Sequence, residues 1–383
     1  MLLHPDTIVI TGIGAVTPLG EDPEMIWQKL LHGKTAARKW DDLEQQQFKH
    51  TIACRIDSLS CPPENRGKTM AIMAAKKALQ QAALPADESI GVFIGTTMGE
   101  SAAFEKAAEG QPLDLHQYNG ECFVNAIREH FYLRGQGVSY GNACAAGNYA
   151  IGGAVKAIRN NKCQAALAGG VEPFSRIAMA GFSRSRSMAP ELCRPFDQNR
   201  KGMQLGEAAV ILYLEKYQSA LRRGVTPFAT VETLGLSSDA YHLTAPDPTG
   251  CGMRRAMEQA LRLKGLRPSD AGWINAHGTG TELSDAAEAK AIYSLFGTGV
   301  KVSSYKGAFG HSLGAATALG AFITAYGLYK QALPLTTNHT ETDREFKIGI
   351  VRENISVQNL RWALNCGYAF GGHNSALLMG TAN

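Results

Sequence analysis

The sequence lacks the marks of several large classes of protein. Charged residues make up only 19% of the 383, and the formal net charge is +4, which argues against a dedicated nucleic-acid binder. None of the eight cysteines belongs to a CxxC pair or lies at zinc-ligand spacing from a histidine, so we expect no metal site. No apolar run reaches membrane-spanning length, and the N-terminal residues are too polar for a secretory signal. We therefore expect a cytoplasmic protein with reduced thiols.

The residues that are present are typical of a compact α/β protein. Apolar residues make up 45% of the chain, which also contains 41 glycines. Apolar, β-branched runs alternate with helical patterns, which predicts buried sheets covered by helices, and no low-complexity linker divides the chain. The runs that predict strands are 7–16, 90–95, 164–170, 208–214, 228–236, 273–276 and 301–304, and those that predict helices are 24–32, 68–83, 252–264, 285–296 and 315–329. Residues 174–194 are expected to form a loop.

The first predicted strand, 7–16, contains Gly12 and Gly14 near its end, as would be found where a dinucleotide-binding loop begins. However, Thr17 stands where the third glycine is required, and Pro18 interrupts the helix that should follow. We therefore expect no dinucleotide site here, and the sequence indicates no other cofactor.

Cys144 lies in a turn between the extended residues 138–140 and a nearly uncharged helix that includes 151–158. The positive end of that helix favours a thiolate over a thiol, and the small residues around Cys144 leave room for a substrate. The alternative is a buried cysteine in a tight junction of glycine and alanine, which is common.

Two histidines lie in matching settings. His277 follows the predicted strand 273–276, and His311 follows the strand 301–304; both lie in glycine-rich turns, where α/β proteins place their reactive groups. Each histidine by itself is more often a structural turn residue than a catalyst. Together with Cys144, they suit nucleophilic catalysis combined with stabilisation of a developing anion.

Several separate motifs occur in the order of one known family. They are Ala143-Cys144-Ala145, Arg194-Pro195-Phe196-Asp197, Gly206-Glu207-Ala208-Ala209, Asn275-Ala276-His277-Gly278-Thr279-Gly280-Thr281, Gly310-His311 and Phe370-Gly371-Gly372. The chain resembles the β-ketoacyl-acyl carrier protein synthases of the Cys-His-His type, which are related to thiolases. The resemblance implies a duplicated thiolase-like fold with layers α-β-α-β-α and two mixed five-stranded sheets. Its halves would be residues 1–235, with the cysteine, and 236–383, with the histidines.

The resemblance also implies a mechanism and a site. Cys144 would accept an acyl group from a thioester, with the backbone N–H groups of Cys144 and Phe370 as the oxyanion hole. His277 and His311, as neutral imidazoles, would stabilise the enolate formed when a malonyl thioester loses carbon dioxide, and the product would be a 3-oxoacyl thioester. Such chemistry serves fatty acid or polyketide biosynthesis and requires no metal or nucleotide.

Other residues are assigned by matching positions, each with an alternative. Lys306 would orient the histidines, or be a surface lysine; Asp285 and Glu288 would order the site, or start a solvated helix. The substrate pocket would be lined by Met98, Met203, Phe370, Thr279 and Thr281, with core filling as the alternative for Met98.

The implied partner is an acidic acyl carrier protein, so a basic entrance is expected. Its candidates, each of which also fits ordinary surface charge, are Arg66, Lys68, Arg184, Arg186 and Arg200. The family forms homodimers, here expected through the strand around 164–170. A heterodimer with a second ketosynthase-like subunit also fits.

The chain departs from the family pattern at Glu100 and Gly320, where glycine and glutamate are usual, and also at Lys201, Met203 and His373. These departures leave the acyl group open, between fatty acid, polyketide and polyene chains. Two other functions are weighed. A thiolase would have a second cysteine in place of the histidine pair, and a non-catalytic chain-length subunit would lack Cys144.

Overall fold

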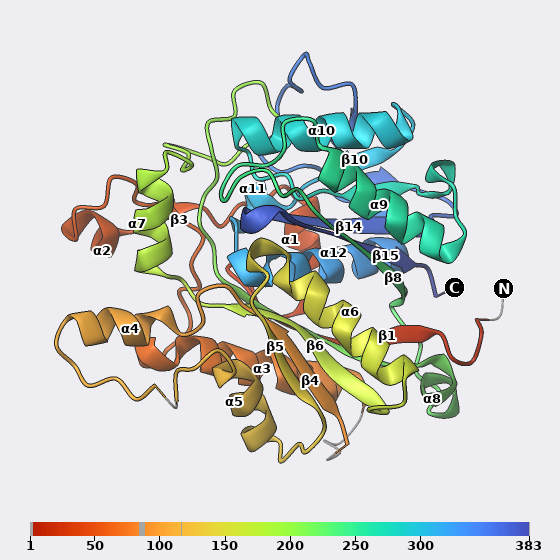
Figure 1. Ribbon diagram of the computed structural model, residues 1–383, viewed down its shortest axis with the longest axis horizontal. Coiled ribbons are helices and arrows are strands. Elements are labelled where there is room, and N and C mark those ends of the chain that lie inside the picture. Colours follow the sequence, from red (N-terminus) through yellow and green to blue (C-terminus); the bar gives the residue numbers. More distant parts are fainter. Residues whose placement is uncertain (1–2, 84–88, 116, 383) are drawn as a thin grey trace.

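A computed structural model describes residues 3–83, 89–115 and 117–382. Over these residues, eleven strands form one sheet in the order β12-β10-β9-β14-β15-β8-β1-β7-β6-β4-β5 (Figure 1). The strands are β1 (Ile8–Val16), β4 (Gly91–Gly95), β5 (Gly137–Tyr140), β6 (Ala165–Glu172), β7 (Ala208–Lys216), β8 (Ala229–Ser238), β9 (Trp273–Asn275), β10 (Lys301–Ser303), β12 (Gly349–Ile350), β14 (Trp362–Ala369) and β15 (His373–Gly380). Two short hairpin-like pairs join β2 (Arg38–Lys39) to β3 (Ile52–Ala53) and β11 (Ala332–Leu333) to β13 (Ile355–Ser356).

The sheet consists of two halves with the same strand arrangement. Outward from its middle, one side runs β1-β7-β6-β4-β5 and the other β8-β15-β14-β9-β10, each with two antiparallel pairs followed by two parallel pairs. The predicted duplicated α/β fold is therefore confirmed. The predicted two five-stranded sheets are joined into one, because β1 and β8 pair at Val9–Thr230 and Ile10–Ala229, and β12 adds a further strand beside β10. The predicted division at 235 falls within β8 and stays a prediction.

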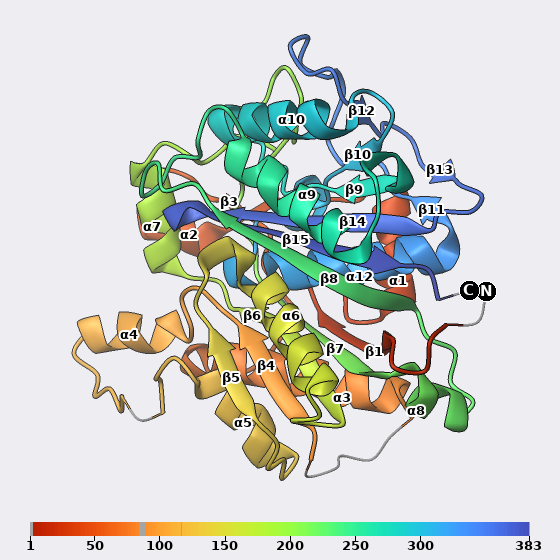
Figure 2. The same ribbon diagram turned by 45° about the vertical axis from the view of Figure 1, so that its right-hand side comes forward.

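Helices form the layers around this sheet. Figures 1 and 2 show α6 and α12 between the two halves, α3 and α5 outside the N-terminal half, and α9 and α10 outside the C-terminal half. The helices are α1 (Pro23–Leu31), α2 (Asp41–Gln45), α3 (Arg66–Gln81), α4 (Ser101–Ala108), α5 (Cys122–His130), α6 (Ala146–Arg159), α7 (Arg176–Arg184), α8 (Tyr217–Arg222), α9 (Cys251–Lys264), α10 (Glu282–Phe296), α11 (Lys306–Phe309) and α12 (Ala316–Lys330). None of them, in the parts of the chain described, has the length and apolarity needed to cross a membrane.

The two central helices begin in the same way. Each is preceded by one 3₁₀ turn, Ala143–Ala145 before α6 and Leu313–Ala315 before α12. The first residue of each turn has a positive φ, 47° at Ala143 and 41° at Leu313, which is uncommon for residues with a side chain. Cys144 is the residue after Ala143, and it therefore lies just beyond the end of β5, in the turn that leads into α6.

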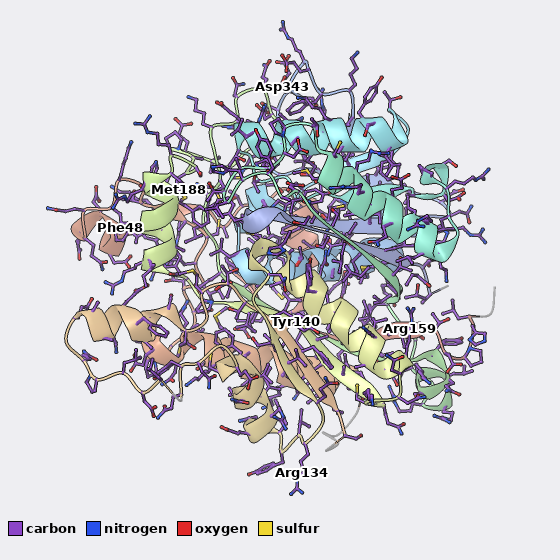
Figure 3. All side chains as sticks on the ribbon, in the orientation of Figure 1. Phe48, Arg134, Tyr140, Arg159, Met188 and Asp343 are labelled. Atoms are coloured by element: carbon purple, nitrogen blue, oxygen red, sulfur yellow. The ribbon has the colours of Figure 1, made fainter. Side chains whose placement is uncertain are left out.

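Two expectations about local structure are wrong. Residues 174–194 contain α7, because Ser175 caps the helix by accepting the N–H of Ala178 (3.1 Å), a start signal that the polar composition obscured. The strand around 164–170 is not a free edge: β6 is buried and pairs with β4 on one side and β7 on the other. The last strand of the described sheet at this end is β5, whose Tyr140 is labelled beside α6 in Figure 3.

Candidate active site

One cavity of about 430 Å³ brings together side chains from distant parts of the chain. Cys144 enters it from the 3₁₀ turn after β5, His277 from the segment after β9, and His311 from the segment after α11. Phe370, in the turn between β14 and β15, completes this end of the cavity. The three predicted reactive residues therefore converge at one end of the sheet.

Cys144 is buried, with 7% of its surface exposed. Burial raises the pKa of its thiol to about 12, although the Lys306 ammonium and the backbone N–H groups of Cys144 and Phe370 act in the opposite direction. This direction is opposite to the preference for thiolate expected from the sequence, because desolvation is the largest cause of the shift in the pKa of Cys144. The same two backbone N–H groups lie beside the sulfur, where they could donate to the carbonyl oxygen of an acyl group bound to it.

The rings of His277 and His311 are in contact edge to face, with centroids 5.2 Å apart and planes inclined by 80°. The N–H of Leu313 donates to Nδ1 of His311 (3.2 Å), so a neutral His311 carries its proton on Nε2. The Nζ of Lys306 lies 3.5 Å from Nδ1 of His277 and also donates to the His277 carbonyl oxygen, which favours the same tautomer. Burial, and next the Lys306 charge, lower the pKa of both histidines well below the usual value. Both imidazoles are therefore neutral Nε2–H donors.

The neutral state of the two imidazoles predicts how the rate of carbon dioxide release depends on pH on the acidic side. This site is expected to release carbon dioxide from a malonyl thioester at the same rate from about pH 8 down to about pH 6, because neither imidazole gains a proton in that range. An ordinary histidine, with a pKa of about 6.5, would gain one. The measurement is carbon dioxide release across this range, with malonyl-carrier protein and malonyl-coenzyme A compared so that effects on carrier binding can be recognised. A decline centred near pH 6.5 with both substrates, if it persisted in Glu288→Gln, would contradict neutral imidazoles; the variant is needed because burial raises the pKa of Glu288, which accepts the His277 N–H, to about 7.

The residues assigned to ordering the site are buried. Glu288 accepts the N–H groups of His277 (2.8 Å) and Gly278 (2.7 Å), and Asp285 accepts those of Phe196 (2.7 Å) and Gly280 (3.1 Å). Both carboxyl groups have 0% exposure, and Lys306 has 1%. The alternatives of a solvated helix start and a surface lysine do not describe these residues. Their bonds fix the segment that carries His277.

The predicted pocket residues divide into two groups. Met203, Phe370, Thr279 and Thr281 line the cavity. Met98 is absent from its lining and instead packs against a buried apolar cluster that includes Cys144. We call this the methionine cluster, because it contains Met179, Met188 and Met203. Phe370 is 40% exposed and its ring centroid lies 5.6 Å from that of Phe182.

Of the five cationic residues predicted at the cavity entrance, some are exposed and others form ion pairs within the fold. Arg184 and Arg186 are exposed, and Arg186 lines the cavity mouth. Arg66 forms a two-bond ion pair with the buried Glu207 (2.8 and 2.7 Å), and Arg200 pairs with Asp343 (2.5 Å), so the structure assigns these two to the interior of the fold. The ammonium of Lys68 lies 4.2 Å from the centre of the Tyr118 ring. An exposed cation that the sequence reasoning left out of the entrance, Lys201, also lines the mouth.

Glu172 is a buried residue that the sequence reasoning missed. Its carboxylate accepts the N–H groups of Thr97 (2.7 Å), Met98 (2.8 Å) and Gly314 (2.8 Å), and so joins the turn after β4 to the turn before α12. Burial raises its pKa to about 7. The sequence did contain a signal for it: Glu172 is the single charged residue of the apolar strand 165–172, and a glutamate is rarely buried unless it has hydrogen-bonding or charged partners.

Comparisons with known proteins agree over nearly the whole chain. Residues 6–220 match the family model described as "Beta-ketoacyl synthase, N-terminal domain", and residues 228–340 match "Beta-ketoacyl synthase, C-terminal domain". The chain is 32% identical to 3-oxoacyl-[acyl-carrier-protein] synthase 2 of Staphylococcus aureus (strain COL), over 97% of each chain. Among solved structures, it is similar to the ishigamide ketosynthase/chain length factor (TM-score 0.92, 33% identity, 99% and 100% of the two chains). It is also similar to a type II polyketide-synthase ketosynthase in complex with its acyl-carrier protein and bound to the hexaketide (TM-score 0.92, 25% identity, 99% and 100%).

Proposed function

The chain belongs to the β-ketoacyl synthase family, and from this membership we propose that Cys144, His277 and His311 carry out its reaction. The chain is an acyltransferase that elongates acyl chains by decarboxylative Claisen condensation, which yields a 3-oxoacyl-acyl carrier protein. The observation that carries the assignment of residues is the convergence of one thiol and two neutral imidazoles on one cavity.

The first half of the reaction is transfer of the acyl group to Cys144. The sulfur attacks the thioester carbonyl and forms a new thioester, while the carrier leaves as a free thiol that takes up the proton lost by Cys144. During the attack the carbonyl oxygen gains negative charge, and the backbone N–H groups of Cys144 and Phe370 are its donors. Because the resting residue is a thiol, this proton transfer accompanies the attack.

The second half uses the histidine pair. A malonyl thioester loses carbon dioxide, the electron pair of the broken carbon–carbon bond forms an enolate, and the two Nε2–H groups donate to the enolate oxygen. The enolate carbon then attacks the acyl group on Cys144, the carbon–sulfur bond breaks, and the 3-oxoacyl thioester leaves. Lys306 acts through His277, whose tautomer it fixes, and is a positioning residue.

The direct test of this function is to follow the protein's mass and its products. Incubation with an acyl-carrier protein is expected to add one acyl group to Cys144, and later addition of malonyl-carrier protein to release carbon dioxide and a 3-oxoacyl product. A non-catalytic chain-length subunit would give no acyl adduct and no carbon dioxide, and a thiolase would condense acetyl-coenzyme A without using malonyl groups.

The partner we propose is an acyl carrier protein, as in the solved complex of a related ketosynthase. Double reversal of Arg186, which lines the cavity mouth, and of the exposed Arg184 nearby in the sequence (Arg184→Glu with Arg186→Glu) is expected to raise KM for carrier-bound substrate about tenfold. KM for small thioesters should stay unchanged, because only the carrier presents an extended acidic surface. Steady-state kinetics with both substrates measures this. The matched control is Arg222→Glu with Arg267→Glu, two exposed arginines that do not line the cavity. Equal losses for both substrates would contradict carrier recognition at this mouth.

We further propose that the chain works as a dimer, with a second copy or with a second ketosynthase-like subunit, as the name of the ketosynthase/chain length factor relative indicates for that protein. Strand β5 supports this, because it ends the described sheet with one row of backbone groups facing outward. Native mass spectrometry of the chain alone distinguishes a homodimer from a monomer that requires a different subunit.

A further inference from the structure

Two buried asparagines join the helix that follows Cys144 to the strand that leads to Phe370. Asn148 lies in α6, four residues after Cys144, and has 0% exposure. Asn365 lies in β14, five residues before Phe370, and has 1% exposure. The Nδ2 of Asn365 donates to Oδ1 of Asn148 (2.8 Å), and the Nδ2 of Asn148 donates to the backbone oxygen of Asn365 (3.0 Å). The two residues therefore bind each other reciprocally, and we call them the asparagine pair.

Other buried groups bind the remaining N–H groups of this pair. The Nδ2 of Asn148 also donates to Oγ of Ser375 (3.1 Å), and the Nδ2 of Asn365 also donates to the backbone oxygen of Thr317 (2.8 Å). The backbone N–H of Asn148 belongs to the first turn of α6, where it has no partner within the helix, and it donates to Oγ1 of Thr317 (2.8 Å). Because Thr317 is in α12 and Ser375 is in β15, the asparagine pair fixes α6 against three other elements.

The position of β14 against α6 is passed on to the site by close backbone contact. Gly367, three residues before Phe370, packs against the residue that follows Cys144, since a Cβ on Gly367 would lie 3.5 Å from Cα of Ala145. The Oγ of Ser375, which binds the asparagine pair, also donates to the backbone oxygen of Gly367 (3.1 Å). No side chain of Gly367 separates the two backbones, so a shift of β14 moves Phe370 relative to Cys144.

We propose that Asn148 is a positioning residue for acyl transfer, which acts by holding β14 against α6 through Asn365. This inference rests on the proposed function of Cys144 as the acyl-carrying residue. The contact keeps the backbone N–H of Phe370 beside the sulfur of Cys144, where a donor must lie within about 3 Å of the developing oxyanion to stabilise it. Without the asparagine pair, β14 shifts at a lower cost and this donor is misplaced. Neither asparagine contacts the rings of the histidine pair, so decarboxylation does not depend on them.

The test measures the two half-reactions separately. Acylation of Cys144 by hexanoyl-carrier protein is followed by the mass of the protein, and carbon dioxide release is measured with malonyl-carrier protein alone. In Asn148→Ala, the maximal rate of acylation is expected to fall about 10- to 100-fold, the cost of misplacing a reacting group by up to about 1 Å. The half-saturating donor concentration and the rate of carbon dioxide release are expected to stay unchanged, because Asn148 does not line the cavity.

Two comparisons identify the asparagine pair as the cause. Asn365→Ala is expected to lower acylation less in the Asn148→Ala background than in the wild-type chain, because two residues that act through one contact have non-additive effects. Thr11→Val is the matched control: it removes another buried side-chain hydrogen bond, from Oγ1 of Thr11 to Glu215, in β1 and outside the cavity. This control is expected to lower the unfolding temperature and leave both half-reactions unchanged.

Each outcome supports or overturns the proposal. If Asn148 serves only the stability of the fold, Asn148→Ala lowers the unfolding temperature as Thr11→Val does and acylation keeps its rate, which would overturn the proposal; so would an equal loss in both half-reactions. If Asn148→Ala does not fold, Ser375→Ala, which removes one acceptor from Nδ2 of Asn148, is expected to slow acylation alone by about threefold, and no slowing would count against the proposal in the same way. Failure of the wild-type protein to form any acyl adduct would contradict the proposed function instead.

Discussion

Replacement of Cys144 by alanine is expected to lower condensation by more than about a thousandfold while carbon dioxide release from malonyl-carrier protein continues. Among the described residues, no other cysteine lines the cavity, so the acyl group has no alternative there to Cys144, the proposed nucleophile. The histidine pair that we propose as the stabiliser of the enolate does not depend on the sulfur. Lys306 and Leu313 contact the Nδ1 atoms of His277 and His311, and Glu288 accepts the backbone N–H of His277. Product mass and released carbon dioxide, measured in the same reaction, separate the two halves.

The control for this variant is Cys251→Ala, which removes an exposed cysteine at the start of α9 and is expected to change neither quantity. Loss of both condensation and carbon dioxide release in Cys144→Ala, with the fold intact by circular dichroism, would show that the thiol is needed for decarboxylation and would contradict the division of labour.

The second large effect is expected at the histidines. His311→Ala and His277→Ala should each lower decarboxylation by about 10²- to 10³-fold, the usual cost of removing one donor to a developing oxyanion, while acylation of Cys144 is retained. His311→Asn should recover part of the loss, since its amide retains an N–H donor. The measurements are carbon dioxide release and the mass of the acyl-enzyme.

His130→Ala serves as the control, because His130 lies at the end of α5, is exposed and does not line the cavity. If either active-site variant lost acylation as severely as decarboxylation, the histidines would be acting on the thiol as well. The enolate assignment would then be contradicted.

Local sequence pattern was sufficient for most of the elements and for the reactive residues. Alternation of apolar strands and helices predicted the α/β class, because the spacing of apolar residues along the sequence differs between strands and helices. Cys144, His277 and His311 were recognisable because each follows a predicted strand in a turn of small residues, and strand ends in such folds collect the reactive groups. Motif order along the chain assigned Lys306, Asp285 and Glu288 to the same site.

Three features followed only from the tertiary structure. Which strand lies at the sheet edge depends on pairing between distant segments, so β6 and β5 could not be distinguished as interface strands from their composition. Whether an arginine faces solvent depends on its partner: Arg66 and Arg200 turn inward to Glu207 and Asp343, which are far away in sequence. The pKa of Cys144 depends on how completely its surroundings exclude water.

The sequence by itself therefore determined the class of fold and the family, and it indicated the three residues that we propose as reactive, because these depend on local periodicity and on short motifs. The tertiary structure decided the burial that raises the pKa of the thiol, the contacts of the two histidine rings, the cations at the cavity mouth and the hydrogen bonds from α3 to Glu100. The physical reason is that burial, hydrogen-bond partners and charge contacts arise from segments that meet only after folding.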